Sequence, residues 1–277
     1  MGHRAQTRTA EAREIVIGSG LAPQREGTMR ILVLQHARVE HPGIFRQFFA
    51  EDGYAWQPVE LDEGEPIPDL EPFDLMVAMG GPQDVWQEDK FPWLVPEKQA
   101  IRKFVMEMRR PYFGICLGHQ LLADAIGGTC GPAAEPEVGV LSVSKTSDGQ
   151  ADALLANAPD PMHALQWHGA EVAALPDGAV VLASSPACKV QAFRYQEHAY
   201  GLQFHVEISQ DTVAEWAEIP KYAASLQAAM GDGAVDRLAA EAAELLPTFN
   251  RDARTPSDNL HSIIAARPPP AGQTRRP

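Results

Sequence analysis

The sequence predicts an α/β protein, in which a mainly parallel sheet carries helices on both faces and has a small antiparallel extension. Over residues 30–126, short apolar runs typical of buried strands alternate with stretches of helical periodicity. One strand-to-helix transition is a tight turn centred on Cys116. From residue 138 to residue 200, strand-like runs follow one another without helices, which predicts the antiparallel part.

The first half of the chain supplies the expected parallel strands and their covering helices. Apolar runs bounded by polar residues predict strands over residues 30–35, 56–61, 73–79 and 111–115. Pro58 places the second of these strands at an edge of the sheet, because proline lacks the N–H that a central strand donates. Apolar residues at helical spacing predict helices over residues 42–51, 97–109 and 117–126.

The second half begins with strands that are separated by turns. They are expected over residues 138–144, 164–168, 179–184 and 190–195. Ser209 then suits the N-cap of a helix that carries Val213 and Trp216 on one face. A last helix is expected over residues 234–246, and Pro247 should end it because proline interrupts helical hydrogen bonding.

We expect one folded domain between two terminal segments without fixed structure. Residues 1–28 lack the long apolar run of a signal peptide, and we interpret them as a disordered extension or the product of an upstream start codon. Met29 directly precedes the first strand, so the folded domain is expected over residues 29–250. The proline-rich residues 251–277 are expected to be a disordered tail.

The composition argues against several classes of function. The chain has 23 Lys and Arg against 37 Asp and Glu, a net charge of −14, which argues against nucleic acid and anionic membranes as partners. Its 3 cysteines, without a Cys-x-x-Cys motif, indicate reduced thiols in the cytoplasm. No His or Cys cluster predicts a metal site, and we expect no cofactor.

Cys116 has the sequence context of an activated nucleophile. Gly114 and Gly118 lie two positions away on either side, which is the pattern of a nucleophile elbow with cysteine in place of serine. A side chain at either glycine would collide with the neighbouring strand or helix. The turn raises the thiol above the sheet at a helix N-terminus, whose partial positive charge favours the thiolate. The amide of Leu117 then points to where an oxyanion would form.

A second segment carries a pair formed by a histidine and an acid. His205 and Glu207 are two positions apart in a short expected strand, residues 201–207, so their side chains face the same way. The Glu207 carboxylate can therefore orient the imidazole and stabilise its charged form. His205 is then suited to serve Cys116 first as base and later as acid.

These two segments together resemble the class I (triad) glutamine amidotransferases. The resemblance is carried by Gly114-Ile115-Cys116-Leu117-Gly118-His119-Gln120 and by Gln203-Phe204-His205-Val206-Glu207. A strand that ends in Gly80-Gly81-Pro82 agrees with it, and it extends over about residues 29–216. Free-standing members similar to the amidotransferase domain of GMP synthase show it most.

The resemblance implies a flavodoxin-like domain and a thioester mechanism on the γ-amide of glutamine or on a related γ-glutamyl bond. In the family, the turn at Gly80 and Gly81 supplies the second oxyanion amide beside Leu117. A glutamine at the position of Gln120 helps to hold the substrate. For His119, a place beside the site and a structural role both remain open.

Two positions depart from the family pattern. Ala170 stands where the family often has the aspartate of His-Gly-Asp, and Glu171 follows it. If that aspartate binds the amino group of the substrate, the alanine changes the glutamine pocket. Val206 stands where the common pattern has proline, and because valine favours strands we expect the triad to persist. His168 either borders the site or is a structural histidine.

The sequence leaves open where the ammonia goes. No nucleotide-binding loop of the Gly-x-x-x-x-Gly-Lys type is present. Our first interpretation is an amidotransferase that passes ammonia to a separate synthase. The alternatives are a self-sufficient hydrolase of γ-glutamyl peptides or conjugates, and a non-catalytic binding or regulatory protein with a vestigial site. An exposed apolar patch at the site mouth would favour the first, and a wide pocket at Ala170 the second.

Overall fold

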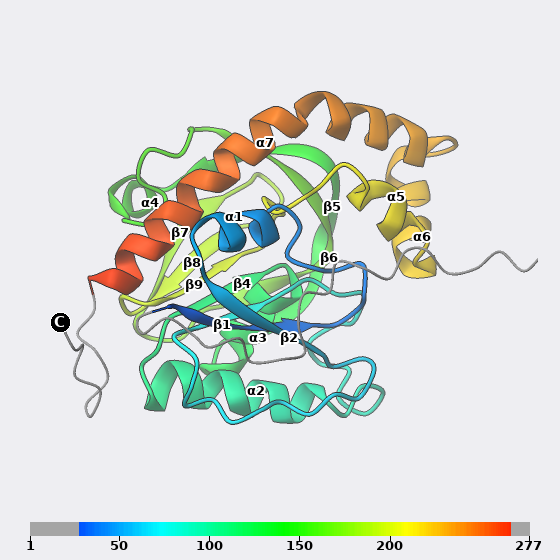
Figure 1. Cartoon of the computed structure of the whole chain (residues 1–277). Coiled ribbons are helices and arrows are strands. Elements are labelled where there is room, and N and C mark those ends of the chain that lie inside the picture. Colours follow the sequence, from blue (N-terminus) through cyan, green and yellow to red (C-terminus); the bar gives the residue numbers. More distant parts are fainter. Residues whose placement is uncertain (1–27, 267–277) are drawn as a thin grey trace, which may run out of the picture.

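A single sheet organises the part of the chain that the structure describes, residues 28–266. In this computed structural model its nine strands lie in the order β2-β1-β3-β4-β9-β8-β7-β5-β6 (Figure 1). Apart from Thr28, the segment 1–28 that is predicted to be an extension lies outside the described residues, and so do residues 267–277.

One half of the sheet is parallel, as the alternation of strands and helices predicts. Neighbouring strands in the series β2-β1-β3-β4-β9 all pair in parallel. Pro58 lies in the edge strand β2, which confirms the position expected for it. The strands of this half are β1 (Arg30–Gln35), β2 (Ala55–Glu60), β3 (Leu75–Ala78), β4 (Tyr112–Ile115) and β9 (Ala199–Leu202).

The other half is antiparallel, so the expectation of a mainly parallel sheet with a small antiparallel extension is wrong. All pairings from β9 through β8, β7 and β5 to β6 are antiparallel. β5 and β6 are much longer than predicted. The added part of β5, residues 129–137, is interrupted by Gly131, Pro132 and Pro136, and that of β6 by Gly169 and Glu171, so neither forms a continuous apolar run. The strands of this half are β5 (Thr129–Lys145), β6 (Met162–Ala174), β7 (Ala179–Ser184) and β8 (Ala192–Tyr195).

Helices cover both faces of the parallel half because the side chains of its strands alternate between two cores. Ile31 and Val33 point into a core under α1 (Phe45–Glu51) and α7 (Ala234–Ala265). Leu32 in the same strand points into a second core. The second core lies under α2 (Leu94–Arg102), its π-helical continuation η1 (Lys103–Glu107) and α3 (Leu117–Ala125).

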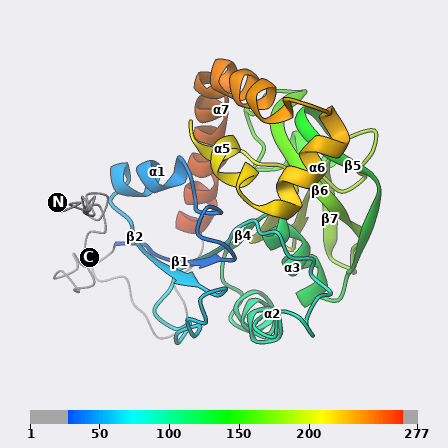
Figure 2. The same ribbon diagram turned by 90° about the vertical axis from the view of Figure 1, so that its right-hand side faces the viewer.

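A third apolar cluster fixes the short helices after β9. Trp167 of β6 packs there against Trp216 and Tyr222, and Leu226 and Leu238 complete the cluster. Figure 2 shows two of these helices together below α7 and beside β6. The remaining helices are α4 (Ser147–Ala151), α5 (Thr212–Ala217) and α6 (Pro220–Met230). In residues 28–266 no helix has the length and apolar character needed to span a membrane.

The last helix corrects two expectations from the sequence. α7 does not stop at Pro247 but continues through Pro256 to Ala265, so residues 251–265 belong to the folded domain and not to a disordered tail. An internal proline costs a helix about 3 kcal/mol. Tertiary contacts offset this cost here: Leu260 is buried, and Arg254 pairs with Asp52 at 2.7 Å.

The packing of the end of α7 can be tested by truncating one buried side chain. We expect Leu260→Ala to lower the free energy of unfolding by about 2 kcal/mol or more, because the side chain leaves a cavity in the core beneath the helix. Urea unfolding of the full chain measures the change. Ser262→Ala, an exposed position two residues later, is the control and should change it by less than about 0.5 kcal/mol. Equal midpoints for L260A and the wild type would contradict the packing.

Candidate active site

Three chain segments that are far apart in the sequence meet at the carboxyl ends of adjacent strands. β4 lies between β3 and β9, so the residue after β4, Cys116, is flanked by the Gly80–Gly81 turn after β3 and by the His205 segment after β9. The carboxyl edge of a parallel sheet is the usual position for a site in α/β proteins. The structure therefore brings the predicted residues together.

The elbow at Cys116 has the strained geometry that the sequence predicts. Cys116 caps the N-terminus of α3 with φ 51°, a backbone region that few residues other than glycine adopt. A Cβ on Gly118 would lie 2.1 Å from the carbonyl oxygen of Ala78 in β3. A Cβ on Gly114 would lie 2.4 Å from the carbonyl oxygen of Gly118. Both glycines are therefore required by close backbone packing.

His205 and Glu207 form the predicted pair, although not in a regular strand. The Nδ1 atom of His205 lies 2.7 Å from Oε1 of Glu207, and both side chains are buried. β9 already ends at Leu202, so the expectation of a strand through residues 201–207 is wrong. One bridge to Leu165 of β6 holds His205 instead, with its N–H donating to the Leu165 carbonyl at 2.9 Å.

The surroundings of His205 favour its charged form. Burial by itself lowers the pKa of the imidazole, but the Glu207 carboxylate and a hydrogen bond with Cys116 outweigh burial and raise the pKa well above its usual value. The charged imidazole is therefore the hydrogen-bond partner of the Cys116 thiol. The ring also meets the edge of Trp216 at a centroid distance of 4.5 Å, which fixes its plane.

A buried ion pair that the sequence analysis missed holds the Gly80–Gly81 turn. The two ring nitrogens of His36 contact the carbonyl oxygen of Gly80 at 2.8 Å and Oε1 of Glu97 at 2.7 Å. Both partners are acceptors, so both nitrogens carry protons. Burial lowers the pKa of His36, but Glu97 and the Gly80 carbonyl outweigh it and raise the pKa. These residues lie on unrelated elements, and no local pattern signals their meeting.

A second carboxyl, Glu40, lies beside His205. A Cβ on Gly80 would be 2.4 Å from Oε2 of Glu40 and 3.2 Å from Cε1 of His205, so only a glycine separates the two side chains. Burial raises the pKa of Glu40, and the hydroxyl of Tyr222 donates a hydrogen bond to it. Neither Glu40 nor Tyr222 is predicted from the sequence, because a single glutamate in a loop and a single tyrosine in a helix match no motif.

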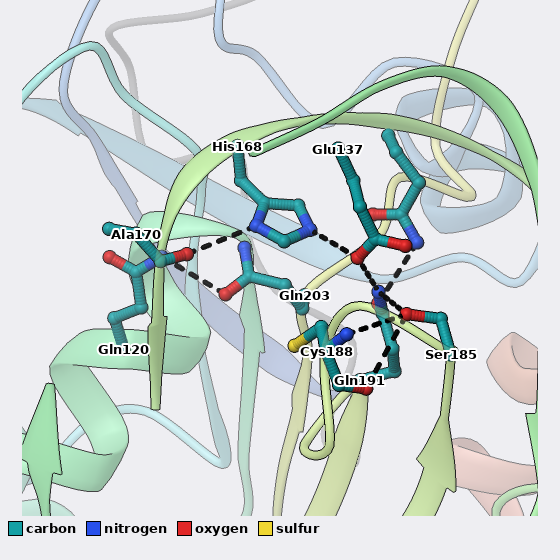
Figure 3. Close-up of polar contacts among 9 residues, drawn as sticks. Gln120, Glu137, His168, Ala170, Ser185, Cys188, Gln191 and Gln203 are labelled. Carbon is teal, nitrogen blue, oxygen red and sulfur yellow. Dashed lines mark hydrogen bonds and ion pairs between the residues drawn. The ribbon is translucent and has the colours of Figure 1, made fainter. Parts of the chain in front are cut away.

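Cys116 opens into a cavity of about 140 Å³. Leu117, Gly81 and Gln120, all predicted for the site, line it. The side-chain amide nitrogen of Gln120 donates to the Ala170 carbonyl at 3.2 Å and to Oε1 of Gln203 at 3.0 Å (Figure 3). The amide oxygen of Gln120 therefore remains as the acceptor for a ligand.

His168, expected either to border the site or to be a structural histidine, does both. The ring lines the cavity, and it is also held in place, because its Nδ1 contacts the Ala170 carbonyl at 3.0 Å and its Nε2 lies 3.2 Å from Glu137 (Figure 3). Glu171 does not replace the missing aspartate, since its carboxylate interacts with Cys188 and does not line the cavity. The alanine thus leaves this wall without an acid.

His119, Cys130 and Cys188 are uncharged and packed in the protein interior or near it. His119 packs edge-on against Phe193 at 4.9 Å, and burial lowers its pKa to about 3, so the ring is neutral. Burial raises the pKa of Cys130 and of Cys188 to about 12, so both are thiols at neutral pH. Within residues 28–266, no group of three or more His, Cys, Asp or Glu side chains is arranged to hold a metal ion.

Comparison with known sequences gives one family and several named relatives. The family described as glutamine amidotransferase class-I matches residues 49–215. The glutamine amidotransferase-like protein YfeJ of Salmonella typhimurium is 31% identical over 67% of this chain and 78% of its own length. A glutamine-hydrolyzing GMP synthase subunit of Sulfolobus acidocaldarius is 33% identical over 55% of this chain and 77% of its own.

Two further matches extend the similarity to another named activity and to a solved structure. Gamma-glutamyl peptidase 3 of Arabidopsis thaliana is 28% identical over 62% of this chain and 70% of its own length. The crystal structure of a glutamine amidotransferase from Thermotoga maritima superposes with a TM-score of 0.75 and 28% identity, covering 86% of this chain and 99% of that one. The family match ends before α6, although α6 contributes Tyr222 to the cavity.

The charge of Glu207 should control the titration of His205. We expect Glu207→Gln to lower the pKa of the His205 ring, because the variant loses the carboxylate that offsets burial. The pH dependence of the ring Cε1–H resonance measures the shift, with His205→Ala identifying the signal. Glu218→Gln, away from the imidazole, is the matched control. An unchanged His205 titration in E207Q would contradict the assigned role of the carboxylate.

The ion pair between His36 and Glu97 should make stability depend on pH in one direction. The pKa of His36 is raised in the folded protein, so its contribution is complete below the unfolded value of 6.5 and is lost as the pH rises through the folded value. The wild type should therefore lose its stability advantage over the double variant H36Q/E97Q above about pH 6.5. Urea unfolding from about pH 6 to 9 measures it. An advantage that grows over this range would refute the charged pair.

Proposed function

Since the chain belongs to the class-I glutamine amidotransferase family, we propose that it cleaves a γ-glutamyl amide bond through a thioester on Cys116. The observation that carries the proposal is the position of the thiol. Cys116 stands at the N-terminus of α3, hydrogen-bonded to an imidazole that Glu207 keeps charged. In this proposal Cys116 is the nucleophile, His205 the acid and base, and Glu207 the residue that orients the imidazole.

In the first step, the Cys116 thiolate attacks the γ-carbonyl carbon and forms a tetrahedral intermediate. The amides of Leu117 and of the Gly80–Gly81 turn are the candidates to stabilise its oxyanion. Gly81 and Leu117 line the same cavity as Cys116, which supports this assignment. Each donor of this kind lowers the barrier by about 3–4 kcal/mol. The buried pair His36–Glu97 supports this assignment, because it holds the carbonyl of Gly80 and thereby the turn.

In the second step, the imidazolium of His205 gives its proton to the amine nitrogen, the C–N bond breaks, and a γ-glutamyl thioester remains on Cys116. The neutral imidazole then takes a proton from water, which attacks the thioester and releases glutamate and the thiolate. Glu207 stabilises the imidazolium at both charged stages. In this proposal one proton shuttle, His205, serves both halves of the reaction.

The fate of the amine distinguishes two forms of this function, release to solvent and transfer to a synthase. An apolar docking patch at the mouth would favour an ammonia-consuming synthase. Among the described residues, the exposed large apolar side chains are only Trp86 and Val95. Similarity to gamma-glutamyl peptidase 3 supports a free-standing hydrolase. Similarity to the GMP synthase subunit of Sulfolobus acidocaldarius supports transfer of ammonia to a synthase, which is the second candidate.

Glutamate release by the purified full chain tests the proposed function. We expect turnover of glutamine or of γ-glutamyl dipeptides, and Cys116→Ala should lower it at least about a thousandfold because the nucleophile is lost. Cys130→Ala is the matched control, since this thiol lies outside the cavity lining. Intact-mass spectra of rapidly quenched wild type should show one added glutamyl group, absent from C116A. Undiminished turnover in C116A would refute the mechanism.

A further inference from the structure

We propose that Lys221 of α6 binds a carboxylate on the departing amine, so that the preferred substrates are γ-glutamyl amino acids or peptides rather than glutamine. This inference rests on the proposed γ-glutamyl hydrolysis and specifies its substrate class. It starts from the part of the cavity that the matched family segment, residues 49–215, does not supply. That part is the N-terminal half of α6, which contributes Lys221, Tyr222 and Ser225 to the lining.

The reaction geometry places the departing amine on the α6 side of the cavity. The carbonyl oxygen must face the amides of Gly81 and Leu117, and the amine nitrogen must face His205, which donates its proton. The His205 ring contacts Trp216 of α5 at 4.5 Å. Trp216 in turn packs against Tyr222 of α6. The glutamyl chain therefore extends the other way, toward the wall that carries Gln120 and Ala170.

The α6 side is also where the charges of the cavity lie. Among the described residues that line it, Lys221 is the one lysine or arginine and Asp84 the one carboxylate. Lys221 Nζ lies 2.8 Å from the Pro82 carbonyl and 2.9 Å from Oδ1 of Asp84. An ammonium group has three donors, so one N–H remains for a ligand, and the side chain is 51% exposed at the rim.

The amine that each substrate releases shows which substrate a cation at the position of Lys221 would bind. Glutamine releases ammonia, which has no group that a cation on this side would bind. A γ-glutamyl amino acid releases an amine with a carboxylate, and in a chain of net charge −14 that carboxylate needs a local cation. Asp84 accepts a hydrogen bond from Lys221, and both residues line the cavity, so the pair holds the ammonium group at its wall. Lys221 is thus a specificity residue and not part of the proton transfer.

The test compares two substrates that differ only at this carboxylate, γ-glutamylalanine and γ-glutamylalaninamide. Glutamate release by the full chain should show a kcat/KM for the free acid about tenfold above that for the amide, with most of the difference in KM, because a charge-assisted hydrogen bond is lost. Lys221→Met should remove the preference, and Lys221→Arg should restore most of it. Lys103→Met, at an exposed position on η1, is the matched control.

Each outcome decides between the possibilities. If K221M lowers kcat/KM equally for both substrates, Lys221 only tethers α6 to the Pro82 loop, and the inference is wrong while the proposed hydrolysis stands. A wild type that prefers glutamine to γ-glutamylalanine overturns the substrate class in the same way. If neither dipeptide nor glutamine is cleaved in a Cys116-dependent manner, the proposed function and the inference both fail.

Discussion

The close approach of α3 to β3 is the constraint on which the rest of the site depends. At Gly118 the helix backbone comes so near the carbonyl of Ala78 that no side chain fits between them. Two residues earlier, Cys116 has a strained backbone and follows β4, so it lies between the ends of β3 and β9. Everything else in the site is arranged around that fixed sulfur atom, which is why its neighbours come from separate segments.

Buried charges hold the turns around the sulfur atom. The His36–Glu97 pair holds the carbonyl of Gly80, and Glu40 packs against Gly80 beside His205. Each carboxylate faces an imidazole that its charge keeps protonated or a hydroxyl that donates to it. Leaving any of these groups unpaired would be costly, so the network selects one conformation of the turn.

Features with a local sequence signature could be predicted from the sequence. Features that depend on contacts between distant segments could not. The elbow, the His205–Glu207 pair and the strands of the parallel half have signatures within a few residues, and the structure brings the predicted site residues together. The roles proposed for them stay predictions. The predicted helix ends too early, at residue 246, because a proline usually interrupts a helix. In the folded protein the burial of Leu260 stabilises the continuation of α7 beyond Pro247. Glu40 and Tyr222 were missed because they meet only in the folded chain.

The tethering of α6 has a consequence for the timing of events at the site. Lys221 is bound to the Pro82 carbonyl and Tyr222 to Glu40, so the helix is attached to both sides of the Gly80–Gly81 turn. An outward movement of α6 that admits a ligand must break or strain these contacts. The turn would then lose its contacts to α6 while the cavity is open, keep the contact with His36, and regain the α6 contacts on closure. The state that admits the ligand would therefore differ from the state in which the Gly80–Gly81 turn is fully held.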